Sequence, residues 1–268
     1  MKYIVVVENK AQLPFVAEHG LALLIEHNSK KILFDTGASY ALVQNATTMG
    51  IDLSTIDTII LSHGHNDHTG GLKHLSDNCT IYASPDISKE RFSIHQSKPI
   101  SNISMPEEAK EKLLNSNWIK NETLSEIFDG VYLSGQIPRI SDEDTGGPFF
   151  LDTTKSSPDF IIDEQALLFA EGVLFQGCCH SGIINTLTHL KTNCPSIKIH
   201  TIVGGLHLVH ASEKRLEQTA NCLNDFGIKK LHLLHCTGEN AIEYLSYKCK
   251  NIEIITPQTG DVISCNLK

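Results

Sequence analysis

The feature that most constrains this chain is a dense group of histidines directly after a short apolar run. The run Thr58-Ile59-Ile60-Leu61 is rich in β-branched residues, which predicts a buried strand. Beyond it, four polar side chains fall within six positions: His63, His65, Asp67 and His68. Imidazole and carboxylate groups suit zinc, iron(II) or manganese. The pattern predicts a metal site where a strand ends. The alternative is a polar loop that holds unrelated histidines.

The spacing His-x-His-x-Asp-His over residues 63–68 resembles the signature of the metallo-β-lactamase superfamily. The resemblance implies an α/β fold, a four-layer αββα sandwich, in which this motif ends one strand. It also implies that His63 and His65 hold one metal ion and that Asp67 and His68 hold a second. The superfamily includes β-lactamases, thioesterases, nucleases, oxidoreductases and transferases. The motif therefore indicates the fold and the metal, and it leaves the reaction open.

The composition is that of a globular protein with enough apolar surface for a core. The chain has 268 residues, 41% of them hydrophobic and 20% charged. A net charge of -9 argues against nucleic acid as a partner, because phosphate binding depends on lysine and arginine. We expect a small-molecule substrate. The sequence leaves open whether the chain forms a homo-oligomer.

The eight cysteines are scattered along a chain long enough to fold without disulfides. The N-terminus reads as a strand over 3–8 and lacks the apolar core of a signal peptide. No apolar run approaches the length of a membrane span, so we expect no membrane partner. A cytoplasmic protein with reduced thiols is the simplest interpretation.

Strands and helices alternate through most of the chain, which predicts an α/β layer fold. The expected strands cover 3–8, 21–26, 31–34, 56–61, 80–83, 166–170, 173–176, 199–203, 230–234 and 252–255. The expected helices cover 40–49, 71–76, 105–114, 183–191, 212–226 and 239–247. Periodicity weakens at about 85–145, and long irregular segments in enzymes often act as lids. We expect a single domain, 1–268, with this segment as an inserted lid-like region.

Two further histidines follow predicted strands. His180 comes after Gly177-Cys178-Cys179, and His235 comes after the strand at 230–234. Side chains at strand ends on one rim of a sheet converge, even when they are distant in sequence. The resemblance implies that His180 completes the first metal site and His235 the second. A core or surface histidine is the alternative for each.

His207 also follows a predicted strand, in Gly204-Gly205-Leu206-His207. It could bind metal, contact substrate or carry a proton, since its unperturbed pKa lies near neutrality. A structural role is the alternative.

The chain departs from the superfamily in one respect. An aspartate usually bridges the two metals, and the corresponding turn here holds Cys178 and Cys179 without a carboxylate. Three alternatives follow: one cysteine is a sulfur ligand, the metals lack a carboxylate bridge, or only one metal binds tightly. Both cysteines could instead be buried thiols. Asp35, in Asp35-Thr36-Gly37, is expected to orient a ligand by hydrogen bonds.

Several segments narrow the resemblance to a prokaryotic subgroup similar to the archaeal dihydropteroate-synthase-like enzymes. They include Gly177-Cys178-Cys179-His180-Ser181-Gly182, Gly204-Gly205-Leu206-His207-Leu208 and His235-Cys236-Thr237-Gly238. The subgroup implies either a metal-dependent hydrolase or a transferase. The transferase joins a dihydropterin pyrophosphate to a ribofuranosylaminobenzene phosphate.

The hydrolase interpretation has a metal-activated water attacking a small, anionic or phosphorylated substrate. Asp67 and His207 are the expected catalytic groups for proton transfer. Arg139 is the candidate for anion recognition, because an arginine fork suits phosphate or carboxylate. Ser181 and Thr237 could hydrogen-bond an oxyanion, or could cap the helices that follow.

The expected cofactor is one or two divalent metal ions. Zinc is the first choice, and iron and manganese are the alternatives. A non-enzymatic interpretation, a metal-binding redox or sensor protein that uses Cys178 and Cys179, stands beside these.

Overall fold

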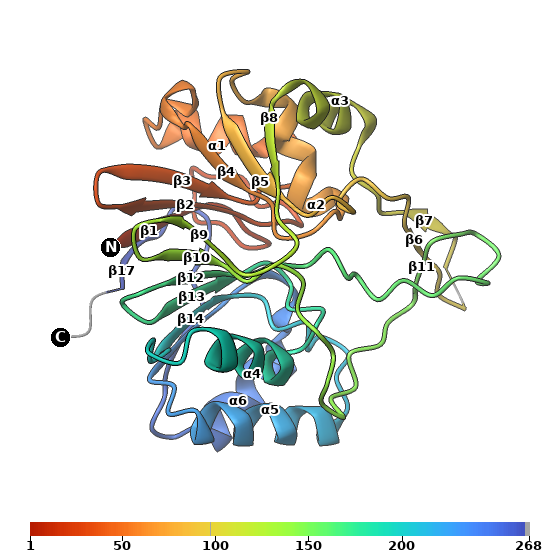
Figure 1. The fold of residues 1–268 in the computed structure, drawn as a ribbon, viewed down its shortest axis with the longest axis vertical. Helices are drawn as coiled ribbons and strands as arrows, with labels where there is room; N and C mark the ends of the chain where they lie inside the picture. The colour runs from red at the N-terminus through yellow and green to blue at the C-terminus, as the bar shows by residue number, and fades with distance from the viewer. Residues whose placement is uncertain (97, 266–268) are drawn as a thin grey trace. The chain divides into compact units, whose positions relative to one another are not determined.

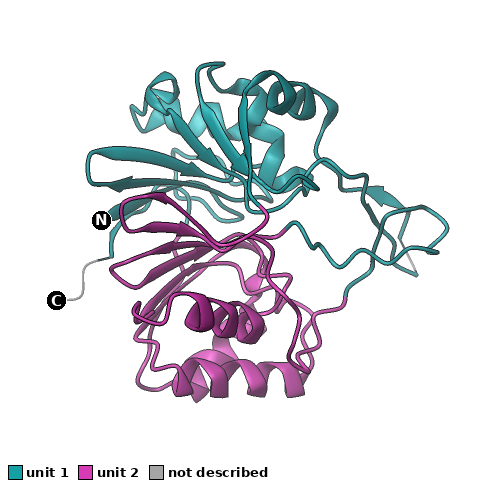
Figure 2. Ribbon diagram, in the orientation of Figure 1, with its two compact units in different colours: residues 1–121, 147–163, 258–268 teal, residues 122–146, 164–257 magenta. Residues whose placement is uncertain are grey.

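The computed structural model describes residues 1–96 and 98–265. Contacts between Cα atoms divide the chain into two compact units, coloured separately in Figure 2. Unit 1 comprises Met1–Asn121, Gly147–Asp163 and Gln258–Lys268, and unit 2 comprises Glu122–Gly146 and Glu164–Pro257.

Unit 1 is built on a mixed sheet with the strand order β17-β1-β2-β3-β4-β5-β8. The strands from β3 to β8 pair in parallel and the remaining neighbours are antiparallel. The strands are β1 (Lys2–Val7), β2 (Ala22–His27), β3 (Lys30–Phe34), β4 (Thr58–Ile60), β5 (Thr80–Ala83), β8 (Asn117–Lys120) and β17 (Val262–Ser264). A small second sheet contains β6 (Phe92–Ser93), β7 (Ser101–Asn102) and β11 (Phe149–Phe150).

The helical segments of unit 1 pack on the apolar residues of its larger sheet. They are α1 (Ala41–Thr48), α2 (Asn66–Thr69) and α3 (Glu107–Asn115), with short 3-10 turns η1 (Leu53–Thr55) and η2 (Gly70–His74). The core beneath them includes Leu33, Leu42 and Ile59, all fully buried.

Unit 2 is built on a second mixed sheet with the order β16-β15-β14-β13-β12-β10-β9. The strands from β13 to β16 pair in parallel, so their carboxyl ends meet at one edge. The strands are β9 (Ser125–Phe128), β10 (Val131–Leu133), β12 (Leu167–Phe169), β13 (Val173–Gln176), β14 (Thr201–Gly204), β15 (Lys230–Leu233) and β16 (Glu253–Ile255).

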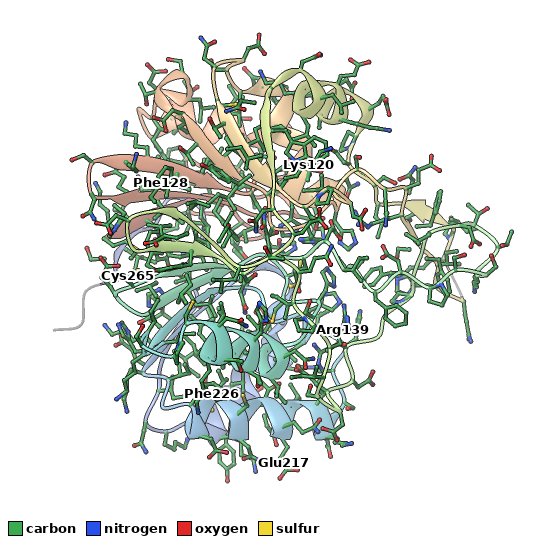
Figure 3. The ribbon with its side chains drawn as sticks, in the orientation of Figure 1. Lys120, Phe128, Arg139, Glu217, Phe226 and Cys265 are labelled. Atoms are coloured by element: carbon green, nitrogen blue, oxygen red, sulfur yellow. The ribbon has the colours of Figure 1, made fainter. Side chains whose placement is uncertain are left out.

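Three α-helices lie along one face of this sheet (Figure 1). They are α4 (Ile183–Asn193), α5 (Glu213–Asp225) and α6 (Glu239–Lys248), and a 3-10 turn, η3 (His235–Thr237), precedes α6. Helix α5 begins at Ser212, whose hydroxyl accepts a hydrogen bond from the Arg215 N–H at 3.3 Å. The helix exposes Glu217 (Figure 3) and buries Leu216 and Leu223 against the core.

Most predicted elements are present, with ends shifted by a few residues. One expectation changes: the helix expected at 71–76 is the 3-10 turn η2, and the short helix α2 lies inside the histidine motif. The turn starts early because the His65 carbonyl accepts hydrogen bonds from the His68 N–H and the Thr69 hydroxyl. Strands β8 and β9 were not predicted, because their half-exposed side chains give no apolar alternation. The single domain and the lid role of 85–145 stay predictions.

Candidate metal centre

The histidine motif of unit 1 packs its imidazole rings against one another. We call His63, His65, Asp67 and His68 the histidine–aspartate cluster. The His63 ring centroid lies 4.5 Å from that of His65 and 4.3 Å from that of His68. His63 Nε2 faces His65 Nδ1 at 3.1 Å, and both residues are buried. Several imidazole nitrogens therefore point into the same small volume, which is the arrangement that a bound cation requires.

Asp67 lies at the more open side of this cluster. Its side chain is 15% exposed, and Asp67 Oδ2 lies 3.3 Å from His19 Nε2 and 3.9 Å from His68 Nε2. The carboxylate is thus close to one ligand candidate and accessible to solvent. The geometry is compatible with the two roles predicted for Asp67, metal ligand and proton acceptor.

Asp35 braces two of the histidines from behind. Asp35 Oδ2 lies 2.7 Å from His68 Nδ1. The Ser62 N–H and hydroxyl both donate to the Asp35 carboxylate at 2.7 Å, and the Ser62 hydroxyl lies 2.9 Å from His63 Nδ1. Hydrogen bonds of this kind set the tautomer and orientation of a ligand histidine. This is the orienting position that the sequence predicts for Asp35.

A buried arginine supports the turn between His63 and His65. The Gly64 N–H donates to Asp163 Oδ2 at 2.8 Å, and Arg91 Nη2 pairs with Asp163 Oδ1 at 2.6 Å. A Cβ atom at Gly64 would lie 1.9 Å from the Ile87 carbonyl oxygen, so only glycine fits there. Burial raises the pKa of Asp163 to about 6, although Arg91 opposes the shift.

Unit 2 gathers a second set of ligand groups from the ends of three adjacent parallel strands. We call Cys178, His180, His207, His235 and Cys236 the thiol–histidine cluster. Cys178 and His180 follow β13, His207 follows β14, and His235 and Cys236 follow β15. Ligand atoms of Cys178, His180 and His207 lie within 4.8 Å of one another, and so do those of Cys178, His235 and Cys236. The predicted convergence of strand ends is therefore present in unit 2.

The backbone at these strand ends adopts an unusual conformation. Cys179, His207 and His235 have φ angles of 63°, 47° and 51°, and Asp35 of unit 1 has 58°. The left-handed region is uncommon for residues other than glycine and costs about 1–3 kcal/mol for each residue. Such conformations concentrate where a side chain must be aimed at a site.

The two neighbouring cysteines have different environments. Cys178 contributes its sulfur to both ligand groups of the thiol–histidine cluster. Cys179 belongs to the hydrophobic core of unit 2, and its sulfur lies 3.8 Å from the Thr186 hydroxyl on α4. Burial raises the pKa of the Cys179 thiol well above its usual value. Of the two cysteines, Cys178 is the one placed to bind a metal.

Cys236 was not singled out in the sequence. Burial opposes ionisation of its thiol, yet hydrogen bonds with Cys178 and His207 and the charge of His235 hold its pKa well below the usual value. Its only sequence signal was its position directly after His235.

Carboxylates and arginines hold the turns of this cluster from behind. Glu164 accepts hydrogen bonds from the His180 N–H at 2.5 Å and the Ser181 N–H at 2.6 Å. Arg215 Nη1 donates to the His207 carbonyl at 3.1 Å, and Arg215 Nε pairs with Glu143 Oε1 at 3.5 Å. Burial raises the pKa of both Glu143 and Glu164. Sequence reasoning missed these groups and Arg91, because their partners lie far along the chain.

The three predicted substrate-binding residues have backbone contacts. Arg139, labelled in Figure 3, donates to the His180 carbonyl at 2.7 Å and also contacts the Thr145 hydroxyl. The Thr237 hydroxyl accepts from the Leu206 N–H at 3.1 Å and donates to the Leu234 carbonyl at 2.9 Å. Ser181 is buried at the start of α4. Substrate contact by these residues stays a prediction.

The donor sets fit divalent metals. The histidine–aspartate cluster offers imidazole and carboxylate, and the thiol–histidine cluster offers imidazole and sulfur.

Comparison of the sequence with known proteins identifies the family. A model described as the metallo-β-lactamase superfamily matches residues 16–129. A Methanocaldococcus jannaschii protein named 7,8-dihydropterin-6-methyl-4-(beta-D-ribofuranosyl)-aminobenzene-5'-phosphate synthase is 31% identical over 249 residues, which cover 85% of this chain and 84% of that protein. The chain belongs to the metallo-β-lactamase superfamily. This confirms the resemblance that the sequence motifs carried, including the similarity to the archaeal synthase.

Two further proteins support the assignment. A second M. jannaschii protein, MJ0448, is uncharacterized and is 33% identical over 245 residues, which cover 90% of this chain and 93% of that protein. The crystal structure of Tm1679, described as a metal-dependent hydrolase of the β-lactamase superfamily, has a TM-score of 0.86 at 28% identity and covers 98% of each chain. The predicted fold class is confirmed: two mixed sheets flanked by helices.

Among the described residues, every helix is too short or too polar to cross a membrane.

Proposed function

We propose that this superfamily member is a metal-dependent hydrolase that acts on a small, anionic or phosphorylated substrate. The observation that carries the proposal is the pair of ligand clusters, each largely buried and each braced by a buried carboxylate. The description of Tm1679 as a metal-dependent hydrolase supports the reaction class. The superfamily pattern assigns His180 to the metal of His63 and His65, and assigns His235 to the metal of Asp67 and His68.

When bound, a divalent metal lowers the pKa of water and polarises the oxygen of a phosphoryl or carbonyl group. The protein groups hold that chemistry in place and move protons. Asp35 keeps the His68 ring oriented through its Nδ1 atom, so that Nε2 is available to a metal. Asp67 has a partly exposed carboxylate that can accept a proton. His207, which has a left-handed backbone conformation in the turn after β14, is the second proton carrier.

The test is metal-dependent turnover of generic substrates. Chelator-stripped protein would be assayed with bis(p-nitrophenyl) phosphate, p-nitrophenyl phosphate and a p-nitrophenyl thioester, each with added zinc, manganese or iron(II). We expect hydrolysis that disappears with the chelator and returns with one of the metals. Absence of turnover for every metal, in protein shown to contain metal, would contradict the hydrolase proposal.

A transferase is the second candidate. It is favoured by the 31% identity to the archaeal synthase over most of both chains. In that reaction the charge to be neutralised is a leaving pyrophosphate, and no water is consumed. Incubation with a dihydropterin pyrophosphate and a ribofuranosylaminobenzene phosphate, followed by mass spectrometry and a pyrophosphate assay, separates the two. A condensed product together with released pyrophosphate would favour the transferase.

The redox or sensor function is less well supported. It required Cys178 and Cys179 to act as a pair, whereas Cys179 packs in the core beside Thr186. Iron with a visible absorption band and no hydrolysis would return attention to redox chemistry.

A further inference from the structure

An aromatic side chain of unit 1 lies against one of the candidate metal ligands. The rings of Phe149, on β11, and His65 have centroids 5.3 Å apart and are tilted by 48°. His65 is buried, whereas Phe149 is only half-buried, so part of its surface is accessible to solvent. A substrate group held at a metal on His65 would therefore lie beside an accessible aromatic ring.

Backbone hydrogen bonds join the small sheet of unit 1 to the histidine motif. The Asn66 N–H donates to the Ile103 carbonyl at 2.9 Å, and the Ile103 N–H donates to the Arg91 carbonyl at 2.9 Å. Arg91 pairs with Asp159 at 2.9 Å, and the Asp159 N–H donates to the Phe149 carbonyl at 2.9 Å. These contacts form a continuous connection from the motif to β11. The fold, and not one ring contact alone, therefore holds the aromatic ring in place.

A glycine close in sequence leaves room for this ring. A Cβ atom on Gly147 would lie 2.6 Å from Cε2 and 2.8 Å from Cδ2 of Phe149. These separations are too short for a side chain at 147 and the ring to coexist in their present positions. A substitution of Gly147 must therefore displace the ring, which provides a way to move Phe149 without replacing it.

The two phenylalanines of β11 lie on opposite faces of the small sheet. Phe149 is in register with Ser93 of β6, and Phe150 is in register with Phe92. Successive side chains of a strand point to opposite faces, so Phe149 shares its face with a small hydroxyl group and Phe150 with another ring. Both phenylalanines are half-buried. Phe150 is therefore a matched control for Phe149.

We propose that Phe149 is a specificity-determining residue that packs against an aromatic part of the substrate, while the anionic part of the same molecule binds at the metal of His65. This role rests on the proposed function and deepens it, because it names the substrate class as aryl-substituted anions. Aromatic pairs gain stabilisation from offset or edge-to-face packing beyond the burial of their area, which an aliphatic group of similar size does not gain.

Direct binding tests this role without any need for turnover. The zinc-loaded full chain would be titrated in a calorimeter with phenylphosphonate, cyclohexylphosphonate and methylphosphonate, which share one anionic group. We expect phenylphosphonate to bind about 2–10-fold more tightly than cyclohexylphosphonate, and methylphosphonate to bind most weakly. Equal dissociation constants for the phenyl and cyclohexyl compounds, or tighter binding of the cyclohexyl compound, would overturn the proposal, as would a lack of binding by all three.

Substitutions assign the preference to one ring. Phe149→Leu should raise the Kd of phenylphosphonate by about 2–10-fold and leave that of methylphosphonate unchanged, whereas Phe149→Tyr should keep the wild-type preference. Gly147→Ala should act like Phe149→Leu, because it displaces the ring. Phe150→Leu should bind all three compounds as the wild type does. If Phe149→Leu kept the wild-type Kd for phenylphosphonate, or if Phe150→Leu lost as much affinity, the assignment to Phe149 would be wrong.

Elemental analysis and circular dichroism check that each variant keeps its zinc and its fold. If a variant failed either check, equal affinities of the wild type for the phenyl and cyclohexyl compounds would still overturn the proposal.

The outcomes also separate this role from the proposed function. Metal-dependent hydrolysis without a preference for the phenyl compound would reject the role of Phe149 and leave the hydrolase standing. A preference that depends on Phe149, without turnover of any substrate, would support the aryl-binding role and reject the hydrolase.

Discussion

The two ligand clusters hold their candidate metal ligands in place in partly different ways. In unit 1 the histidine–aspartate cluster lies in one short segment, and buried carboxylates orient its rings and backbone, with Asp35 at 2.7 Å from His68 Nδ1. In unit 2 the ligands come from three strand ends, and left-handed backbone at His207 and His235 aims them. Side-chain hydrogen bonds brace both clusters, and the second differs in that two of its own candidate ligands, His207 and His235, adopt left-handed backbone.

A buried arginine supports each cluster, and the ion pairs of the two arginines differ in length. Arg91 makes close ion pairs with Asp163 at 2.6 Å and Asp159 at 2.9 Å. Arg215 lies 3.5 Å from Glu143 and donates to the carbonyl of His207. The ion pairs of the buried arginine are therefore shorter in unit 1, and mutations should reveal the difference.

The largest expected effect comes from removing one ligand of either cluster. His63→Ala in unit 1 and His180→Ala in unit 2 should each lose metal and lower kcat/KM by more than about 100-fold, since even groups that only orient a ligand are worth about 10–100-fold. Elemental analysis and turnover measure both. His210→Ala, at an exposed histidine, is the control. If either ligand variant kept metal and activity at wild-type level, its assignment would be wrong.

The second prediction compares the two arginines. Arg91→Met should lower the free energy of unfolding by about 3–5 kcal/mol, because it leaves two buried carboxylates without their partner. Arg215→Met should cost less, because its ion pair is longer. Denaturant unfolding provides the measurement, with Lys110→Met, at a 4.0 Å surface pair, as the control. An equal loss for both arginine variants would remove the contrast.

The same difference explains what the sequence could predict. The histidine motif occupies six consecutive positions after an apolar strand, so its chemistry and its place in the fold were readable together. Its bracing was not, since Gly64 and Asp163 are separated by 99 positions and Arg91 and Asp163 by 72. Pairing over such distances is set by tertiary packing, which leaves no local pattern.

The second cluster was predictable only in part. His180, His207 and His235 each follow a strand, and this position was visible in the sequence. The choice between Cys178 and Cys179 was not, because neighbouring residues at a turn can point in different directions depending on φ. The left-handed φ of 63° at Cys179 is a property of the folded backbone, and no residue type announces it.

The third prediction concerns the pH dependence of stability, and it distinguishes the buried histidine of strand β15 from the candidate metal ligands that follow the strand. Burial lowers the pKa of His232, on β15, to about 4 from 6.5, and the Lys230 charge adds to the shift. The folded state then binds fewer protons than the unfolded state between these values. The free energy of unfolding should be constant above pH 6.5 and fall as the pH decreases toward 4, by about 3 kcal/mol at most.

The measurement is denaturant unfolding of chelator-stripped protein across this pH range. His232→Gln, which is neutral throughout, should flatten the decline, and His210→Gln should leave it unchanged. A decline as steep in His232→Gln as in the wild type would assign the pH dependence to the ligand histidines instead.

The smallest expected effect tests whether the two clusters can be weakened separately. Asp35→Asn keeps the size of the side chain but removes the charge that orients His68, so it should lower metal affinity by about 10–100-fold. The loss should affect the metal that the superfamily pattern assigns to Asp67 and His68, while the ultraviolet absorbance of cadmium bound to the thiols Cys178 and Cys236 persists. Competition with a chromophoric chelator gives the affinity, and Asp57→Asn, at an exposed carboxylate, is the control. Loss of both signals together would mean that side-chain bracing in unit 1 also determines the geometry of the sulfur ligands, and the contrast between the clusters would no longer hold.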